Sequence, residues 1–161
     1  MHRLLVLVDE TGFKLGRASI HYLERTSKKA TYLLVTAIYA PEINGIFDIV
    51  AASNCNSEIK VFATYLFQVL ITAGIFWGLV EDKRYDAAWI TAWCEAYGIV
   101  TFIPARGDGL EPFDGSRLEA DLRYKWLMRQ KYFRALIESS FSFMKSFFDS
   151  VRSRGRQDGG D

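Results

Sequence analysis

Two carboxylates stand within two residues of the ends of apolar segments of this sequence, and a third lies in a helical segment near its end. Asp9 follows residues 4–8 (Leu-Leu-Val-Leu-Val), an unbroken apolar run that predicts a strand covered on both faces. Asp82 follows a predicted strand at residues 75–80, and Glu138 lies in the last predicted helix. Because α/β sheets usually place their chemistry at the carboxyl ends of strands, Asp9 and Asp82 are candidate site residues.

Each acid also has an ordinary structural explanation. Asp9 can begin an Asx-type turn with the Thr-Gly pair that follows it, and Asp82 can solvate a turn. Glu138 can form a helix-surface pair with Arg134, worth about 0.3–0.5 kcal/mol. At 3.6 residues per turn, Arg134, Glu138 and Lys145 lie along one side of the helix over roughly 16 Å.

The charges are unevenly distributed although the formal net charge is only +1. Residues 13–29 contain one acid, Glu24, and five bases, which are Lys14, Arg17, Arg25, Lys28 and Lys29. The middle of the chain is acidic, through Glu42, Asp48, Glu58, Glu81, Asp82, Asp86 and Glu95. Such separation of sign can serve a polyanion-binding surface beside a cation-binding pocket, and it is also common on ordinary solvated surfaces.

The length of 161 residues suits one domain with a single sizeable core. We expect this domain to span residues 1–151, followed by a disordered, charged tail at residues 152–161. Cys55 and Cys94 are too few for a disulfide framework, and with two histidines they do not make a zinc-ligand set. The expected setting is therefore reducing and cytoplasmic, and no secretory signal is visible.

Residues 61–80 contain no charged residue and are long enough to imitate a membrane span. Against that alternative, polar side chains recur every fourth residue and draw a stripe along one helical face, at Lys60, Thr64, Gln68 and Thr72. Gly74 then stands where a helix C-terminus favours glycine. We therefore predict a helix at residues 57–73 followed by the strand at 75–80, and no membrane partner.

The order of the remaining elements predicts an α/β fold. The expected strands lie at residues 4–8, 31–39, 46–51, 75–80 and 99–103, with a hairpin turn at Asn44-Gly45. The expected helices lie at residues 57–73, 87–97 (capped by Asp86) and 117–151, the last with one break. Three meandering strands followed by strand–helix alternation describe a mixed sheet with helices on both faces, the order of ribonuclease H-like domains. In such a sheet the first and fourth strands are parallel neighbours, which would bring Asp9 and Asp82 to the same edge.

Four segments carry acids and bases in a recurring arrangement. Residues 8–13 read Val-Asp-Glu-Thr-Gly-Phe, and residues 81–87 place an Asp after a strand and before Tyr-Asp. Residues 99–106 combine a strand with Pro-Ala-Arg, and residues 134–145 separate Arg, Glu and Lys by three and six residues. In this order they resemble the motifs of insertion-sequence DDE transposases, and the resemblance covers nearly the whole chain.

Three features depart from the family pattern. Arg84 stands where a small residue is usual, and the Tyr of the third motif is Lys131 here, with Tyr132 one place late. Family members normally carry a DNA-end-binding region before the first Asp, whereas only residues 1–8 precede it here. We therefore expect a catalytic core whose end-recognition domain is absent or is supplied by a separate chain.

The resemblance implies that Asp9, Asp82 and Glu138 form a catalytic triad holding two Mg²⁺ or Mn²⁺ ions, with Asp9 bridging them. Hard cations of this kind prefer carboxylate ligands, and two of them can activate the attacking oxygen and stabilise the leaving one. The implied activity is cleavage of DNA at transposon ends followed by strand transfer.

The resemblance also implies partners. Arg134 and Lys145 would hold phosphates of double-stranded DNA, from transposon ends and target, and Lys14 and Arg17 would add backbone contacts. A homodimer on DNA is expected.

Two other functions remain open from the sequence. One is a catalytically inactive remnant that binds DNA or another protein, and the other is a different ribonuclease H-like nuclease, such as a junction resolvase.

Overall fold

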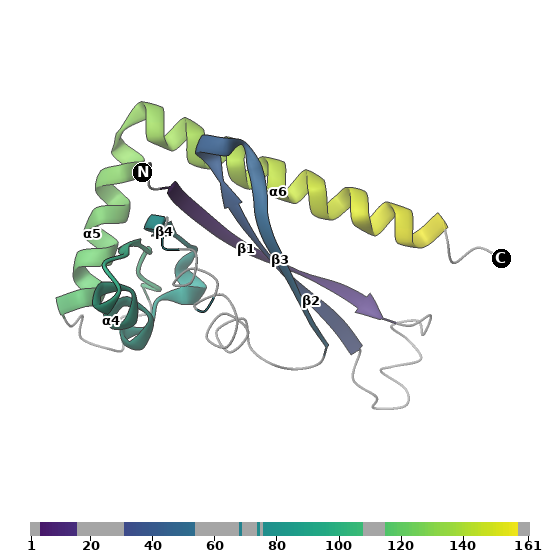
Figure 1. Ribbon diagram of the computed structural model, residues 1–161, viewed down its shortest axis with the longest axis horizontal. Helices are drawn as coiled ribbons and strands as arrows, with labels where there is room; N and C mark the ends of the chain where they lie inside the picture. Colours follow the sequence, from purple (N-terminus) through teal and green to yellow (C-terminus); the bar gives the residue numbers. More distant parts are fainter. Residues whose placement is uncertain are drawn as a thin grey trace.

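A computed structural model describes residues 4–15, 31–53, 68, 74, 76–107 and 115–157 (Figure 1). Its strands are β1 (Leu4–Leu15), β2 (Thr31–Ala40), β3 (Gly45–Ser53), β4 (Phe76–Val80) and β5 (Val100–Phe102). Its helices are α4 (Ala88–Ala96), α5 (Gly115–Arg129) and α6 (Lys131–Gln157), with short 3₁₀ turns η1 (Pro41–Ile43) and η3 (Lys83–Tyr85). Except for Gln68, which is helical, the predicted helix at residues 57–73 lies outside the described residues.

The five strands form one mixed sheet in the order β3-β2-β1-β4-β5. β2 is antiparallel to both β1 and β3, whereas β4 is parallel to both β1 and β5. The predicted hairpin is confirmed, because Asn44 adopts a left-handed conformation (φ 49°) and its N–H donates to the carbonyl of Pro41. The prediction that the first and fourth strands are parallel neighbours is also confirmed.

β1 is longer than predicted. It continues to Leu15, and its second half pairs with β2 in an unbroken register that places Asp9 opposite Ala37 and Thr11 opposite Val35. The Asx turn considered for Asp9 is therefore wrong, and so is the placement of Asp9 at the end of the strand. The parallel pairing with β4 nevertheless ends at Leu7, so Asp9 lies just beyond the part of β1 that has strands on both sides.

Helices cover both faces of the sheet, as predicted (Figure 1). Val6 and Val8 of β1 pack in one core with Ile90 and Cys94 of α4. Leu5 and Leu7 point the other way, into a second core that includes Ile137, Met144 and Phe148 of α6. α5 contributes to both cores, through Ala120 and Leu127 respectively.

The predicted C-terminal helix has its break at Gln130, between α5 and α6. α6 then continues to Gln157, so residues 152–157 are helical where a disordered tail was predicted. The described ranges contain no helix that is both long and apolar enough to cross a membrane. Most of the candidate span at residues 61–80 lies outside them, and its last residues form β4.

Candidate functional site

Asp9, within β1, and Asp82, just after β4, lie at equivalent positions relative to the pairing of these two neighbouring strands. Leu7 and Val80 are the last parallel pair of β1 and β4, and each acid lies two residues beyond its member of that pair. Leu7 and Val80 both pack into the core under α6. Because side chains alternate along extended backbone, and Asp82 is extended (φ −81°, ψ 173°), both acids belong to the α6 side of the sheet.

A guanidinium lies between these two carboxylates. Arg84 Nε donates to Asp82 Oδ2 at 2.8 Å, and Arg84 Nη2 lies 4.0 Å from Asp9 Oδ1. The backbone N–H of Arg84 also donates to Asp82 Oδ1 at 2.7 Å, so that Asp82 caps the η3 turn. The side chains of Asp9, Asp82 and Arg84 are 25, 39 and 51% exposed, which leaves the cluster open to solvent.

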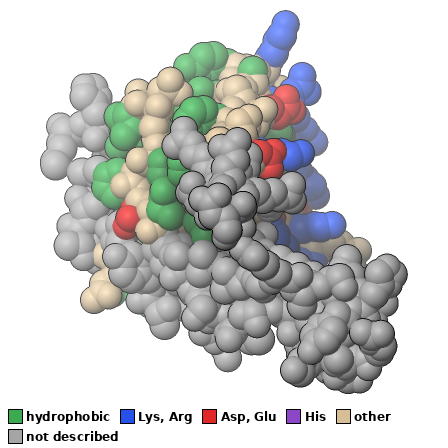
Figure 2. All heavy atoms as spheres, turned by 90° about the vertical axis from the view of Figure 1, so that its right-hand side faces the viewer, with side chains coloured by type: hydrophobic (Ala, Val, Ile, Leu, Met, Phe, Trp, Pro, Cys, Tyr) green, Lys and Arg blue, Asp and Glu red, His purple; other side chains and the backbone are tan. Residues whose placement is uncertain are grey.

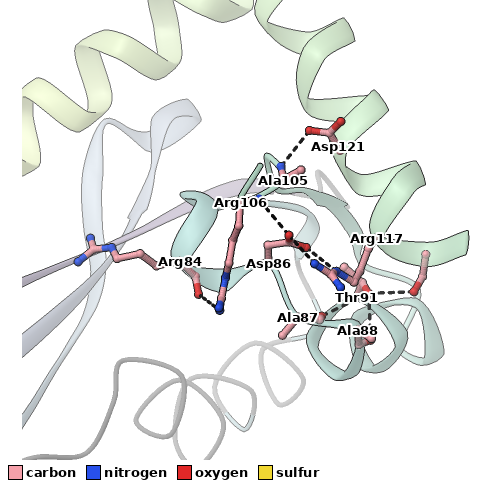
Figure 3. Close-up of polar contacts among 10 residues, drawn as sticks. Arg84, Asp86, Ala87, Ala88, Thr91, Ala105, Arg106, Arg117 and Asp121 are labelled. Carbon is pink, nitrogen blue, oxygen red and sulfur yellow. Dashed lines mark hydrogen bonds and ion pairs between the residues drawn. The ribbon is translucent and has the colours of Figure 1, made fainter. Parts of the chain in front are cut away.

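Asp86 anchors the segment that carries Asp82 and Arg84. Its carboxylate accepts hydrogen bonds from Arg117 Nε and Nη2, both at 2.8 Å, and from the backbone N–H of Arg106 at 3.1 Å (Figure 3). Arg106 Nη2 in turn donates to the carbonyl of Arg84 at 3.0 Å. Asp86 was predicted to cap α4, but the N-cap is Ala87, without a side-chain cap. Asp86 instead links the η3 turn to the loop after β5 and to α5.

The electrostatics of Asp86 follow from this arrangement. The hydrogen bonds from Arg117 hold the pKa of the Asp86 carboxyl below its ordinary value, against the opposing effect of burial. Asp86 is therefore a buried carboxylate neutralised by Arg117. No local pattern in the sequence indicated Arg117, because it lies 31 residues from its partner.

A pocket of about 470 Å³ opens between β1 and α6 beside Asp9. It is lined by Asp9, Thr11, Phe141, Ser142, Lys145, Phe148 and Asp149. The predicted phosphate-binding Lys145 therefore shares a cavity with Asp9. Asp149, which the sequence analysis did not single out, lies one helical turn beyond Lys145 and lines the same cavity.

Glu138 is exposed on α6 and does not line this pocket. The pKa of the half-buried Tyr124 on α5 is raised, chiefly by burial and then by the charges of Asp82 and Glu138. Both acids therefore lie within electrostatic range of the Tyr124 side chain. Within the residues that the structure describes, no three His, Cys, Asp or Glu side chains are grouped so that they could hold a metal ion. The position of Glu138 as third ligand therefore stays a prediction.

The predicted DNA-binding residues are distributed over two elements. Arg134 and Lys145 are exposed on α6, and Lys14 lies in β1 opposite Tyr32. Arg17 lies outside the described residues. Figure 2 shows Lys and Arg side chains gathered along one side of the molecule, with acidic side chains among them. The exposed bases of α5 and α6 also include Lys125, Arg129 and Lys131.

No protein-family model matches this chain, and no curated protein matches it either. A similar solved structure is a chain in the simian T-cell lymphotropic virus intasome in complex with PP2A regulatory subunit B56 gamma. The two share 11% sequence identity and a TM-score of 0.39. The likeness covers 86% of this chain and 42% of that chain, so this chain spans less than half the length of its neighbour.

Proposed function

We propose that this chain is a ribonuclease H-like catalytic core of the DDE transposase type, which cleaves DNA phosphodiesters with divalent cations. One observation carries the proposal: β1 and β4 pair in parallel and place Asp9 and Asp82 at equivalent positions, with one guanidinium between them. The strand order β3-β2-β1-β4-β5 is also the order of ribonuclease H-like domains. Transposition further requires strand transfer at a target site, which we include in the proposal.

The donor set suits the proposed ions. Asp9 and Asp82 offer carboxylate oxygens, the ligands that Mg²⁺ and Mn²⁺ prefer, and the guanidinium of Arg84 already takes the place of a cation between them. Glu138 is the proposed third ligand. Two such ions, if bound by these carboxylates, would supply activation of the attacking oxygen and stabilisation of the leaving oxygen of the phosphodiester. Asp86 holds the η3 turn in place, and so positions Asp82 for this task.

Double-stranded DNA is the proposed partner, bound as transposon end and as target by a homodimer. Lys145 lies beside Asp9 in the same pocket, and Arg134 is exposed on the same helix. Both can neutralise phosphates next to the acids without reading bases. Recognition of the transposon end would then fall to a separate domain or chain.

A nicking assay on supercoiled plasmid tests the proposed function. The full chain is expected to convert supercoiled plasmid to nicked plasmid in the presence of Mg²⁺ or Mn²⁺. This conversion should stop when EDTA removes the metal. Nicking that persists in EDTA, or that is absent with either metal, would contradict the proposal. The same assay on linear, nicked and branched duplexes distinguishes a transposase core from a junction resolvase, because a junction resolvase would prefer the branched substrate.

Two observations favour a second candidate, a catalytically inactive remnant that binds DNA or a protein. Arg84 already pairs with both acids, and the described residues contain no three-ligand group. In calorimetry, a remnant would show no Mn²⁺ binding that is lost when Asp9 or Asp82 is substituted. The proposed nuclease would bind Mn²⁺ and lose that binding in Asp9→Asn.

Lys145→Ala is expected to weaken DNA binding uniformly across sequences. Each lost phosphate contact reduces the slope of log K against log salt concentration by about one, because one fewer counterion is released. The measurement is a salt titration of duplex affinity in Ca²⁺. Arg123→Ala is the control of equal charge change, because Arg123 pairs with Glu119 on α5. Equal salt slopes for the wild type and Lys145→Ala would remove Lys145 from the DNA interface.

A further inference from the structure

The Arg84 side chain uses the oxygens that a cation at this site would use. Its Nε contacts Asp82 Oδ2 at 2.8 Å, and its Nη2 lies 4.0 Å from Asp9 Oδ1. Two carboxylates so close to a single group repel each other when both are ionised, and a positive charge between them relieves the repulsion. The guanidinium provides that charge.

The main chain of Arg84 is held independently of its side chain. Its N–H donates to Asp82 Oδ1. Its carbonyl accepts a hydrogen bond from Arg106 Nη2 (Figure 3). The Arg84 side chain is half exposed and extends from this anchored turn toward β1. It can therefore leave the two acids by rotation about its own bonds, while the turn that positions Asp82 stays in place.

We propose that Arg84 is a built-in competitor for divalent cations at the Asp9–Asp82 pair. The guanidinium and a metal ion cannot occupy the space between the two carboxylates together, so the ion binds as Arg84 withdraws. This inference rests on the proposed function, and it adds a form of regulation to that site. The withdrawn guanidinium remains beside the acids, where a DNA phosphate is a suitable bidentate acceptor. DNA and metal would therefore favour each other's binding.

The test is Mn²⁺ binding to the full-length chain, measured by calorimetry and by the electron paramagnetic resonance signal of free Mn²⁺. Arg84→Ala is expected to bind Mn²⁺ roughly two- to fivefold more tightly than the wild type, the range expected for a partly exposed ion pair. Arg84→Lys keeps the charge without the planar fork, and should fall between them. Arg123→Ala, which removes a guanidinium on α5, should bind like the wild type.

The outcomes separate the two proposals. Tighter binding by Arg84→Ala, lost again when Asp82→Asn is added, supports the competition. Equal affinities for wild type and Arg84→Ala, with binding still dependent on Asp82, overturn the competition and leave the metal site standing. Weaker binding by Arg84→Ala also overturns it, because Arg84 would then merely support the site. If no variant binds Mn²⁺, the proposed function fails and the competition fails with it.

Discussion

Asp9→Asn is expected to reduce Mn²⁺-dependent DNA nicking by at least about a hundredfold while leaving the fold intact. Loss of a group that only orients a metal ligand already costs about 10–100-fold in activity or affinity, so loss of the ligand itself should cost more. The amide has nearly the same shape as the carboxylate, and Asp9 is partly exposed on β1, which limits the structural cost. Asp82→Asn is expected to have an effect of the same size.

Glu138→Gln tests which carboxylate is the third ligand of the proposed metal site. Glu138 does not line the pocket beside Asp9, whereas Asp149 does. Loss of nicking in Glu138→Gln would support the triad that the family resemblance implies. If Glu138→Gln keeps full nicking activity and Asp149→Asn loses it, Asp149 rather than Glu138 is the third carboxylate of the site.

Plasmid conversion rates measure this effect, and circular dichroism verifies that each variant is folded. Glu119→Gln is the matched control, because Glu119 pairs with Arg123 on α5, outside the pocket beside Asp9. A folded Asp9→Asn or Asp82→Asn variant that nicks at the wild-type rate would remove that residue from the mechanism.

The proximity of Asp9 and Asp82 was predictable from the sequence for a simple reason. Residues 4–8 and 75–80 are apolar throughout, which is typical of strands covered on both faces, and the Asn44-Gly45 turn joins β2 to β3 as a hairpin. Once β1 and β4 are parallel neighbours with Leu7 opposite Val80, Asp9 and Asp82 each lie two residues beyond that pair, at the same level of the sheet. The extension of β1 to Leu15 was not predictable in this way. Asp9, Glu10, Gly12 and Lys14 have little strand preference of their own, and pairing with β2 stabilises them in the strand.

The third carboxylate of the site could not be identified from sequence spacing alone. Glu138, Lys145 and Asp149 recur at helical spacing, so a sequence pattern places them on one side of α6. Which turn of that helix lies over Asp9 depends on its position along the sheet. That position is set by the packing of Ile137, Met144 and Phe148 against the strands, and no spacing within the helix encodes it.

Asp86→Ala is expected to lower the free energy of unfolding by about 3 kcal/mol at neutral pH, because it leaves the charge of Arg117 without its partner. The two side chains are only 3 and 12% exposed, so water compensates little for the lost contacts. Urea denaturation measures the change. Arg123→Ala removes a pair on α5 whose side chains are 32 and 62% exposed, and it should cost less than about 0.5 kcal/mol. The double variant Asp86→Ala/Arg117→Ala should cost less than the sum of the single changes, because the buried charges are removed together.

The pH dependence of the stability that the Asp86 carboxylate contributes identifies the cause of that contribution. Arg117 holds the pKa of Asp86 below its ordinary value in the folded chain, so the unfolded chain takes up the proton first as the pH falls. The stabilisation should be complete above the unfolded pKa of about 4, and should disappear as the pH falls through the lower folded pKa. The gap in unfolding free energy between wild type and Asp86→Asn should therefore be constant from about pH 5 to 7 and narrow below about pH 4. A gap that stayed unchanged in acid would mean that Asp86 stabilises this turn by shape and packing rather than by charge.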